Sequence, residues 1–127
     1  MVVNDPAVVA EVTERFVAYE RALVAGDIAQ LGNDFWDSEL TVRYGVRENL
    51  YGAAEIAAWR AVAPPIPPDR ALGPTVVTTF GNDVATTNTE FRSPGSPVVG
   101  RQTQTWIRLP EGWRIVSAHV SLLKVDD

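Results

Sequence analysis

The hydrophobic pattern of the chain changes type once, at the proline-rich segment 63–70, APPIPPDR. Before this segment the apolar residues recur with the spacing of helices, and after it they alternate as they do in strands. Because proline fixes φ and lacks a backbone donor, the segment itself cannot be a helix or a central strand. Helices followed by a run of strands predict an α+β fold, with the helices on one face of a curved, mixed or antiparallel sheet.

The N-terminal half predicts three helices. The first begins at Asp5 and Pro6, a capping residue followed by proline, and ends at Gly26. A second, short helix begins after Asp27. The third runs over 52–62, with Ile56 and Trp59 facing inward, and short extended pieces are expected at 40–44 and 47–50. The apolar stripe of the first helix consists of Val9, Val12, Phe16, Tyr19 and Leu23.

The C-terminal half predicts four strands, at 75–80, 84–91, 98–109 and 113–123, separated by turn-forming residues. We expect one domain over residues 1–127, a cone-shaped half-barrel in which the sheet wraps the three helices. Such a cone leaves a closed-bottomed pocket that holds one small ligand.

The composition excludes several classes of function. A net charge of −5 disfavours sequence-independent binding of nucleic acid, which needs a basic surface. No apolar run approaches the roughly 18 residues of a membrane span, and no signal peptide is visible, so we expect a cytoplasmic protein without membrane partners. The absence of cysteine and the single histidine disfavour a metal site, and no cofactor is implied.

Arg43 and Tyr19 are the leading candidates for chemistry. Arg43 interrupts an apolar strand pattern, where a charge is costly unless an anion meets it. It either pairs with a protein carboxylate such as Glu90 or grips a ligand carboxylate through two hydrogen bonds. Tyr19 is either a core tyrosine or a phenol at the pocket floor that donates to a ligand. In both cases the positive charge of Arg43 would favour the phenolate of a nearby tyrosine.

Polar side chains alternate along two of the predicted strands. Gln102 and Gln104 share a face with Trp106, and Asn88 and Glu90 form a similar row on the preceding strand. We expect these amides and the carboxylate to line the pocket and bind substrate, although a polar outer sheet face would give the same pattern. Two tryptophans, Trp36 and Trp59, complete the expected substrate-binding set.

The last strand carries the single histidine. His119 alternates with Trp113 and Ile115, and the opposite row is aliphatic. The aliphatic row should face inward, which places all three residues on the outer face of the sheet. Exposed apolar surface of this kind favours a subunit contact.

The order of the elements resembles the nuclear transport factor two-like superfamily, which has a cystatin-like fold and includes ketosteroid isomerase and SnoaL-like proteins. Within it, the chain is most similar to the AtzH-like family. The segments that carry this resemblance are AYERAL (18–23), FW (35–36), TVRYGVRENLYGAAEI (41–56), EFR (90–92), GRQTQTW (100–106) and EGWRIVSAHVS (111–121).

The resemblance implies a homodimer and a site in which Tyr19 and Arg43 are catalytic. It also implies decarboxylating hydrolysis of a carboxylated urea, of the 1,3-dicarboxyurea to allophanate type, without a cofactor. Steroid isomerisation is disfavoured because the positions of its two acidic residues are occupied by Tyr44 and Gln104. Two alternatives remain open: a non-catalytic module that binds a small ligand, and a SnoaL-like acid/base enzyme on an apolar substrate.

Overall fold

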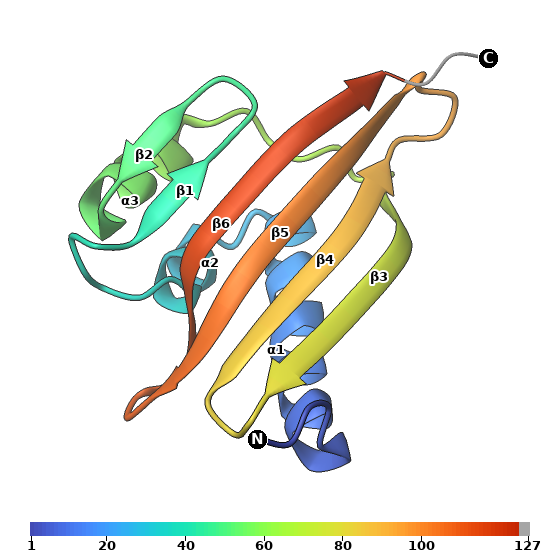
Figure 1. Ribbon diagram of the computed structural model, residues 1–127. Helices are drawn as coiled ribbons and strands as arrows, with labels where there is room; N and C mark the ends of the chain where they lie inside the picture. The colour runs from blue at the N-terminus through green and yellow to red at the C-terminus, as the bar shows by residue number, and fades with distance from the viewer. Residues whose placement is uncertain (125–127) are drawn as a thin grey trace.

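The computed structural model describes residues 1–124. Three helices lie on one side of a curved, open sheet of six strands (Figure 1). The elements in chain order are α1 (Pro6–Ala25), α2 (Ile28–Asp34), β1 (Val42–Tyr44), β2 (Asn49–Tyr51), α3 (Ala53–Val62), β3 (Ala71–Phe80), β4 (Val84–Arg92), β5 (Val98–Leu109) and β6 (Gly112–Lys124). The predicted α+β half-barrel is confirmed. The last three residues of the expected domain lie outside the described residues.

Helix α1 begins and ends at the predicted signals. The Asp5 side chain accepts a hydrogen bond from the Ala7 N–H at 3.0 Å, and Gly26 ends the helix with a left-handed φ of 71°. The buried stripe starts at Val8 rather than at Val9, and otherwise follows the predicted spacing. Tyr19 therefore points from the middle of α1 toward the sheet.

Helix α2 packs its short apolar face against β6, and helix α3 packs its short apolar face against β2. Asp27 caps α2 by accepting from the Gln30 N–H at 3.1 Å, as the sequence predicts. On α3 the buried residues are Ile56 and Arg60, whereas Trp59 is half-buried. A basic residue thus occupies the inner face of α3, which matters for the site described below.

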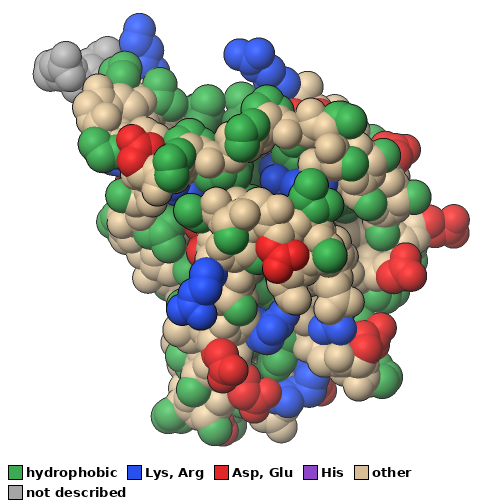
Figure 2. Space-filling model, turned by 180° about the vertical axis from the view of Figure 1, so that it is seen from behind, with side chains coloured by type: hydrophobic (Ala, Val, Ile, Leu, Met, Phe, Trp, Pro, Cys, Tyr) green, Lys and Arg blue, Asp and Glu red, His purple; other side chains and the backbone are tan. Residues whose placement is uncertain are grey.

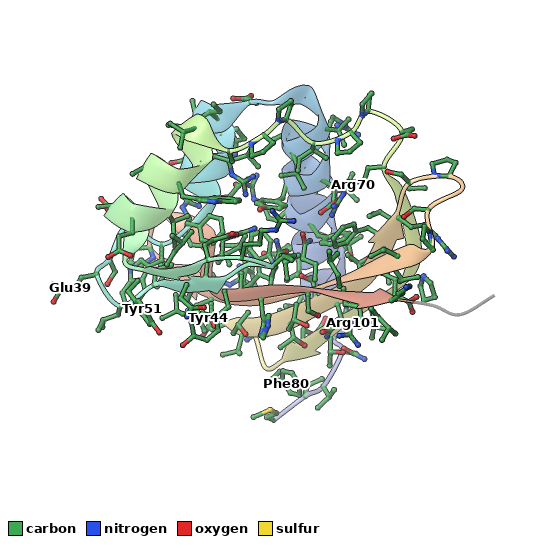
Figure 3. All side chains as sticks on the ribbon, turned by 90° about the horizontal axis from the view of Figure 1, so that it is seen from above. Glu39, Tyr44, Tyr51, Arg70, Phe80 and Arg101 are labelled. Atoms are coloured by element: carbon green, nitrogen blue, oxygen red, sulfur yellow. The ribbon has the colours of Figure 1, made fainter. Side chains whose placement is uncertain are left out.

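The strand order is β2-β1-β6-β5-β4-β3. The four long strands form antiparallel pairs, and the short β1 joins the edge of β6 in parallel, with Arg43 opposite Ala118. The sheet is therefore mixed. Its inner face packs against α1, and Figure 3 shows Tyr44, Tyr51 and Arg101 on the side away from the helices.

The faces of β5 follow the prediction, but those of β6 do so only in part. Gln102, Gln104 and Trp106 are buried on the inner face. The pairing between β5 and β6 shifts by one residue near Trp106, which pairs with Ile115. Because such a bulge reverses the side-chain alternation, Trp113 and Ile115 are buried and the expectation that they lie on the outer face is wrong. His119, beyond the shift, is exposed as predicted.

The core lies between α1, α2 and the inner sheet face. Its largest fully buried members are Trp106 and Ile115, which pack with the buried stripe of α1. None of the described helices combines the length and apolar character needed to cross a membrane.

Candidate functional site

Tyr19 lies in the core and is 3% exposed. Its ring meets the ring of Phe35 edge-on, with 6.3 Å between centroids. Burial raises the pKa of Tyr19, while the positive charges of Arg60, Arg43 and, more weakly, Arg70 oppose the rise. The charge of Arg43 therefore favours the phenolate as expected, but burial outweighs it and the net pKa of Tyr19 is raised. At neutral pH Tyr19 is a protonated phenol that can donate a hydrogen bond.

Arg43 projects from β1 toward the helices, because its neighbours Val42 and Tyr44 take the other face. Its side chain is 8% exposed, and one guanidinium nitrogen donates to a Glu48 carboxylate oxygen at 2.8 Å. The guanidinium carbon also lies 4.2 Å from the centre of the Trp59 ring. The protein partner of Arg43 is therefore Glu48, and not Glu90.

The turn between β1 and β2 is built around this ion pair. The Gly45 N–H donates to the Glu48 carbonyl oxygen at 2.8 Å, which closes the turn. A Cβ at position 45 would overlap the Glu48 carboxylate and lie 2.7 Å from the Arg43 nitrogen. Glycine at this position leaves the space in which the Glu48 side chain reaches Arg43.

Arg60 is a site residue that the sequence reasoning missed. It lies in the last turn of α3, is 9% exposed, and stacks on Trp59 at 4.7 Å. Within residues 1–124, no carboxylate lies within 4.0 Å of its guanidinium. Burial lowers the pKa of Arg60, and the nearby Tyr19 hydroxyl opposes that shift. Arg60 lies four residues after Ile56 and therefore on the same face of α3, and this spacing is the sequence signal that would have identified Arg60 as an inward-facing residue.

Arg70 enters the interior from the end of the proline-rich segment, beside α1 (Figure 3). Its guanidinium forms two hydrogen bonds to the Glu20 carboxylate, at 3.0 and 3.3 Å, and a longer one to Gln102 at 3.4 Å. The Gln102 amide in turn donates to Glu20 at 3.0 Å. Arg70 also stacks on Phe91 at 4.0 Å. Gln102 therefore faces inward as predicted, but it is bonded to this ion pair.

These residues form what we call the arginine cluster. It contains three buried guanidinium groups, whose charges act on the Tyr19 hydroxyl, and the two carboxylates paired with Arg43 and Arg70. Its members are Tyr19, Glu20, Arg43, Glu48, Arg60 and Arg70. With both carboxylates ionised, the guanidinium groups exceed them by one. Because an unpaired charge inside a protein is costly, the cluster favours the binding of an anion.

Asn88 and Glu90 lie on the other face of the sheet. The inward residues of β4 are Ala85, Thr87 and Thr89, so both polar side chains are exposed on the outer face. They line a broad hollow of about 570 Å³ that also includes Arg101 and His119. The structure thus separates Asn88 and Glu90 from Tyr19 and Arg43, contrary to the expected shared pocket.

Two further predicted site residues, Gln104 and Trp36, form hydrogen bonds within the protein. Gln104 is buried on the inner face and accepts a hydrogen bond from the Thr87 hydroxyl at 3.1 Å. Thr87 accepts in turn from the Trp106 indole N–H at 3.0 Å. Trp36 lies half-buried between α2 and β1, where its backbone N–H donates to the Ile115 carbonyl at 2.9 Å. Of the two predicted tryptophans, Trp59 is the one that contacts the arginine cluster.

The arrangement suits the binding of carboxylates. Guanidinium groups hold carboxylates through paired hydrogen bonds, and a protonated phenol beside them can donate to a carbonyl oxygen or a leaving nitrogen. Among residues 1–124, no group of three or more His, Asp or Glu side chains is arranged to hold a metal ion.

Comparisons with known proteins agree with this fold. Two solved structures match closely: a cystatin-like fold protein from Burkholderia xenovorans (52% identity, TM-score 0.95, 99% of both chains) and a protein of unknown function from Pectobacterium atrosepticum (54% identity, TM-score 0.92, 96% of this chain and 95% of that one). A nuclear transport factor two-like protein from Salmonella enterica shares the fold at 24% identity and TM-score 0.70, covering 96% of this chain and 94% of that one.

The comparison with curated proteins returned no match. The model of the AtzH-like family matches residues 1–126. The chain therefore belongs to the AtzH-like family.

Proposed function

We propose that this protein is a cofactor-independent enzyme that binds a small carboxylate at the arginine cluster. The reaction is the decarboxylating hydrolysis of a carboxylated urea, of the 1,3-dicarboxyurea to allophanate type. The observation that carries the proposal is the burial of Tyr19 in the same interior region as Arg43 and Arg60, whose positive charges act on its hydroxyl. Membership of the AtzH-like family supports the same reaction class.

Each group has a role that follows from its surroundings. Arg43 holds a substrate carboxylate, and the stacking of its guanidinium on Trp59 fixes the plane in which the two hydrogen bonds form. Tyr19, which is protonated at neutral pH, donates to the urea carbonyl oxygen or to the departing nitrogen. Arg60 adds positive charge beside the same hydroxyl.

The chemistry needs only modest assistance. The bond between the carboxylate carbon and the urea nitrogen breaks, its electron pair stays on nitrogen, and carbon dioxide leaves. The nitrogen takes up one proton, which Tyr19 can deliver and recover from water, so the product is allophanate. Orientation and electrostatic stabilisation are the main contributions that such a site makes.

One observation favours a second candidate, a module that binds a carboxylate without turnover. Glu48 already occupies the Arg43 guanidinium with a carboxylate. A ligand carboxylate that replaced it would be held in the same way with no chemical step. Tyr19 would then act as a hydrogen-bond donor to the bound ligand.

The test is release of carbon dioxide and allophanate from 1,3-dicarboxyurea by the purified protein. We expect Tyr19→Phe to lower kcat and Arg43→Lys to raise KM, because one removes the proton donor and the other the paired hydrogen bonds. Arg101→Gln, on the outer face, serves as the control and should match the unmodified protein. Turnover that is unchanged in Tyr19→Phe contradicts the assigned role, and malonate binding without turnover supports the second candidate.

A further inference from the structure

Arg60 also lines a cleft that the proposed reaction does not use. The cleft has a volume of about 200 Å³ and lies between the end of α1, α2 and the segment 63–66. Figure 2 shows the helical face, on which Lys and Arg side chains lie recessed between hydrophobic ones. Among the described residues that line the cleft, Arg60 is the one that carries a charge.

The rest of the cleft wall is apolar. Leu23 and Leu31 form buried parts of the wall, and Ile66 of the proline-rich segment forms a half-buried part of it. A second, smaller hollow of about 40 Å³ is also lined by Arg60 and is otherwise apolar, with Ile56 in its lining. Arg60 is therefore the one charged residue among the described, otherwise apolar residues that line the two hollows.

A buried charge among apolar walls indicates the chemical class of ligand that the cleft would bind. A guanidinium that is nine-tenths buried, without a carboxylate within 4.0 Å in residues 1–124, calls for an anionic group. Apolar walls favour an aliphatic body on that group. At about 30 Å³ for each water-sized group, the cleft holds about six or seven such groups, which corresponds to a carboxylate of four or five carbons.

We propose that the cleft bounded by α1, α2 and segment 63–66 binds a short aliphatic monocarboxylate, with Arg60 holding the carboxylate group. The proposal concerns binding alone and stands whether or not the protein releases carbon dioxide from a carboxylated urea. A ligand at this site would also neutralise a charge that faces Tyr19, so it would couple the cleft to the arginine cluster.

The test is calorimetric titration of the full chain with ethanoate, propanoate, butanoate and pentanoate, and with butanamide as the uncharged analogue. We expect the affinity to rise about fourfold for each added methylene up to butanoate or pentanoate, because each buried methylene contributes about 0.8 kcal/mol. Butanamide should bind at least tenfold more weakly than butanoate, since it cannot form the charged contact. Equal affinity for ethanoate and pentanoate, or for butanoate and butanamide, overturns the proposal.

Variants separate the charged contact from the apolar one. We expect Arg60→Gln to weaken butanoate binding at least tenfold and Arg60→Lys to weaken it less, with Arg101→Gln as the unchanged control. Ile66→Ala, at a half-buried position of the wall, should weaken butanoate binding while leaving ethanoate binding unchanged. Butanoate affinity that is unaffected by both Arg60→Gln and Ile66→Ala contradicts the site. If Arg60→Gln does not fold, the ligand series and Ile66→Ala decide the question.

Discussion

Arg43 donates a hydrogen bond to Glu48 at 2.8 Å across the turn between β1 and β2. The Glu48 carboxylate occupies one nitrogen of the Arg43 guanidinium, and the Glu48 side chain is 22% exposed. A ligand for Arg43 must therefore displace Glu48 or share the guanidinium with it. This relationship makes Glu48 the residue whose change is most informative about anion binding.

Replacing Glu48 by glutamine should uncover Arg43. We expect Glu48→Gln to lower the free energy of unfolding by about 1–3 kcal/mol, because a mostly buried guanidinium loses its charged partner. Malonate should bind about tenfold more tightly to the Glu48→Gln variant than to the unmodified protein, if displacing the Glu48 carboxylate from Arg43 costs about 1.4 kcal/mol. Melting curves with and without malonate measure both effects. Glu14→Gln, at an exposed position of α1, is the control, and malonate stabilisation equal in both variants contradicts the prediction.

Placing alanine at position 45 should act through the same pair. The added Cβ overlaps the Glu48 carboxylate and lies 2.7 Å from an Arg43 nitrogen, so we expect Gly45→Ala to expel Glu48 and to shift the Arg43 guanidinium. Malonate affinity should therefore increase, but less than in Glu48→Gln. The double variant with Glu48→Gln should bind malonate no more tightly than Glu48→Gln alone, because both changes remove one interaction. Additive effects on malonate affinity would show that Gly45 acts through something other than Glu48.

The pKa of Tyr19 gives a prediction for alkaline pH. Burial raises this pKa in the folded chain, so the folded state holds the phenol proton more tightly than the unfolded state does. The free energy of unfolding should therefore fall as pH rises past the ordinary tyrosine value of about 10, until pH reaches the raised folded pKa.

Urea denaturation at several pH values between 9 and 11.5, about the range in which tyrosine titrates, measures this loss. Tyr19→Phe should show a smaller fall than the unmodified protein. Tyr51→Phe is the comparison that measures the contribution of the exposed tyrosine, because the hydrogen bond of its hydroxyl with Tyr44 at 3.2 Å also raises the pKa of Tyr51. A fall of equal size in Tyr19→Phe would mean that the buried phenol does not cause it.

The ion pair between Glu20 and Arg70 should stabilise the fold. We expect Glu20→Gln to cost about 3–5 kcal/mol in the free energy of unfolding, because Arg70 then remains buried without a carboxylate. Chemical denaturation measures the loss. Glu11→Gln, which removes the exposed partner of Arg108, is the comparison and should cost less. Equal losses in the two variants would contradict a special role for the buried pair.

We expect the protein to form homodimers through the outer face of the sheet. Tyr44 contacts both Tyr51 and His119 edge-on there, with centroids 5.9 and 5.8 Å apart, and all three residues are exposed. Light scattering coupled to size exclusion should give twice the monomer mass. A Tyr44→Glu variant should shift the mass toward the monomer while retaining the far-ultraviolet spectrum, and a mass unchanged by it would point to another interface.

The sequence predicts the elements well because each carries local signals. The caps at Asp5, Asp27 and Gly26 fix helix ends through short-range contacts, and the alternation in β5 places Gln102 and Gln104 inward. The bulge in β6 escapes such reasoning. A single shift in pairing reverses the alternation, and its position depends on the neighbouring strand rather than on the residues of β6 themselves.

The site is harder to predict because it depends on contacts between distant segments. Arg43 and Tyr19 stand out as polar groups within apolar patterns, and both prove to be buried. The choice of Glu48 as partner follows from the geometry of one turn at Gly45, which no periodicity reveals. Arg60 was missed because arginine in the last turn of a helix usually serves an exposed C-terminus.

The parallel pairing of β1 with β6 sets the order in which the cluster can assemble. Val42 pairs with Ser117, so the strand that carries Arg43 gains its second neighbour, after β2, from the last described strand. Tyr19 and Arg43 are synthesised early, but we expect them to reach their final arrangement only after residues 112–124 have been synthesised and have joined the sheet. We therefore expect nascent chains to acquire anion-binding capacity late and in one step, with the slow kinetics typical of contacts between distant parts of a sequence.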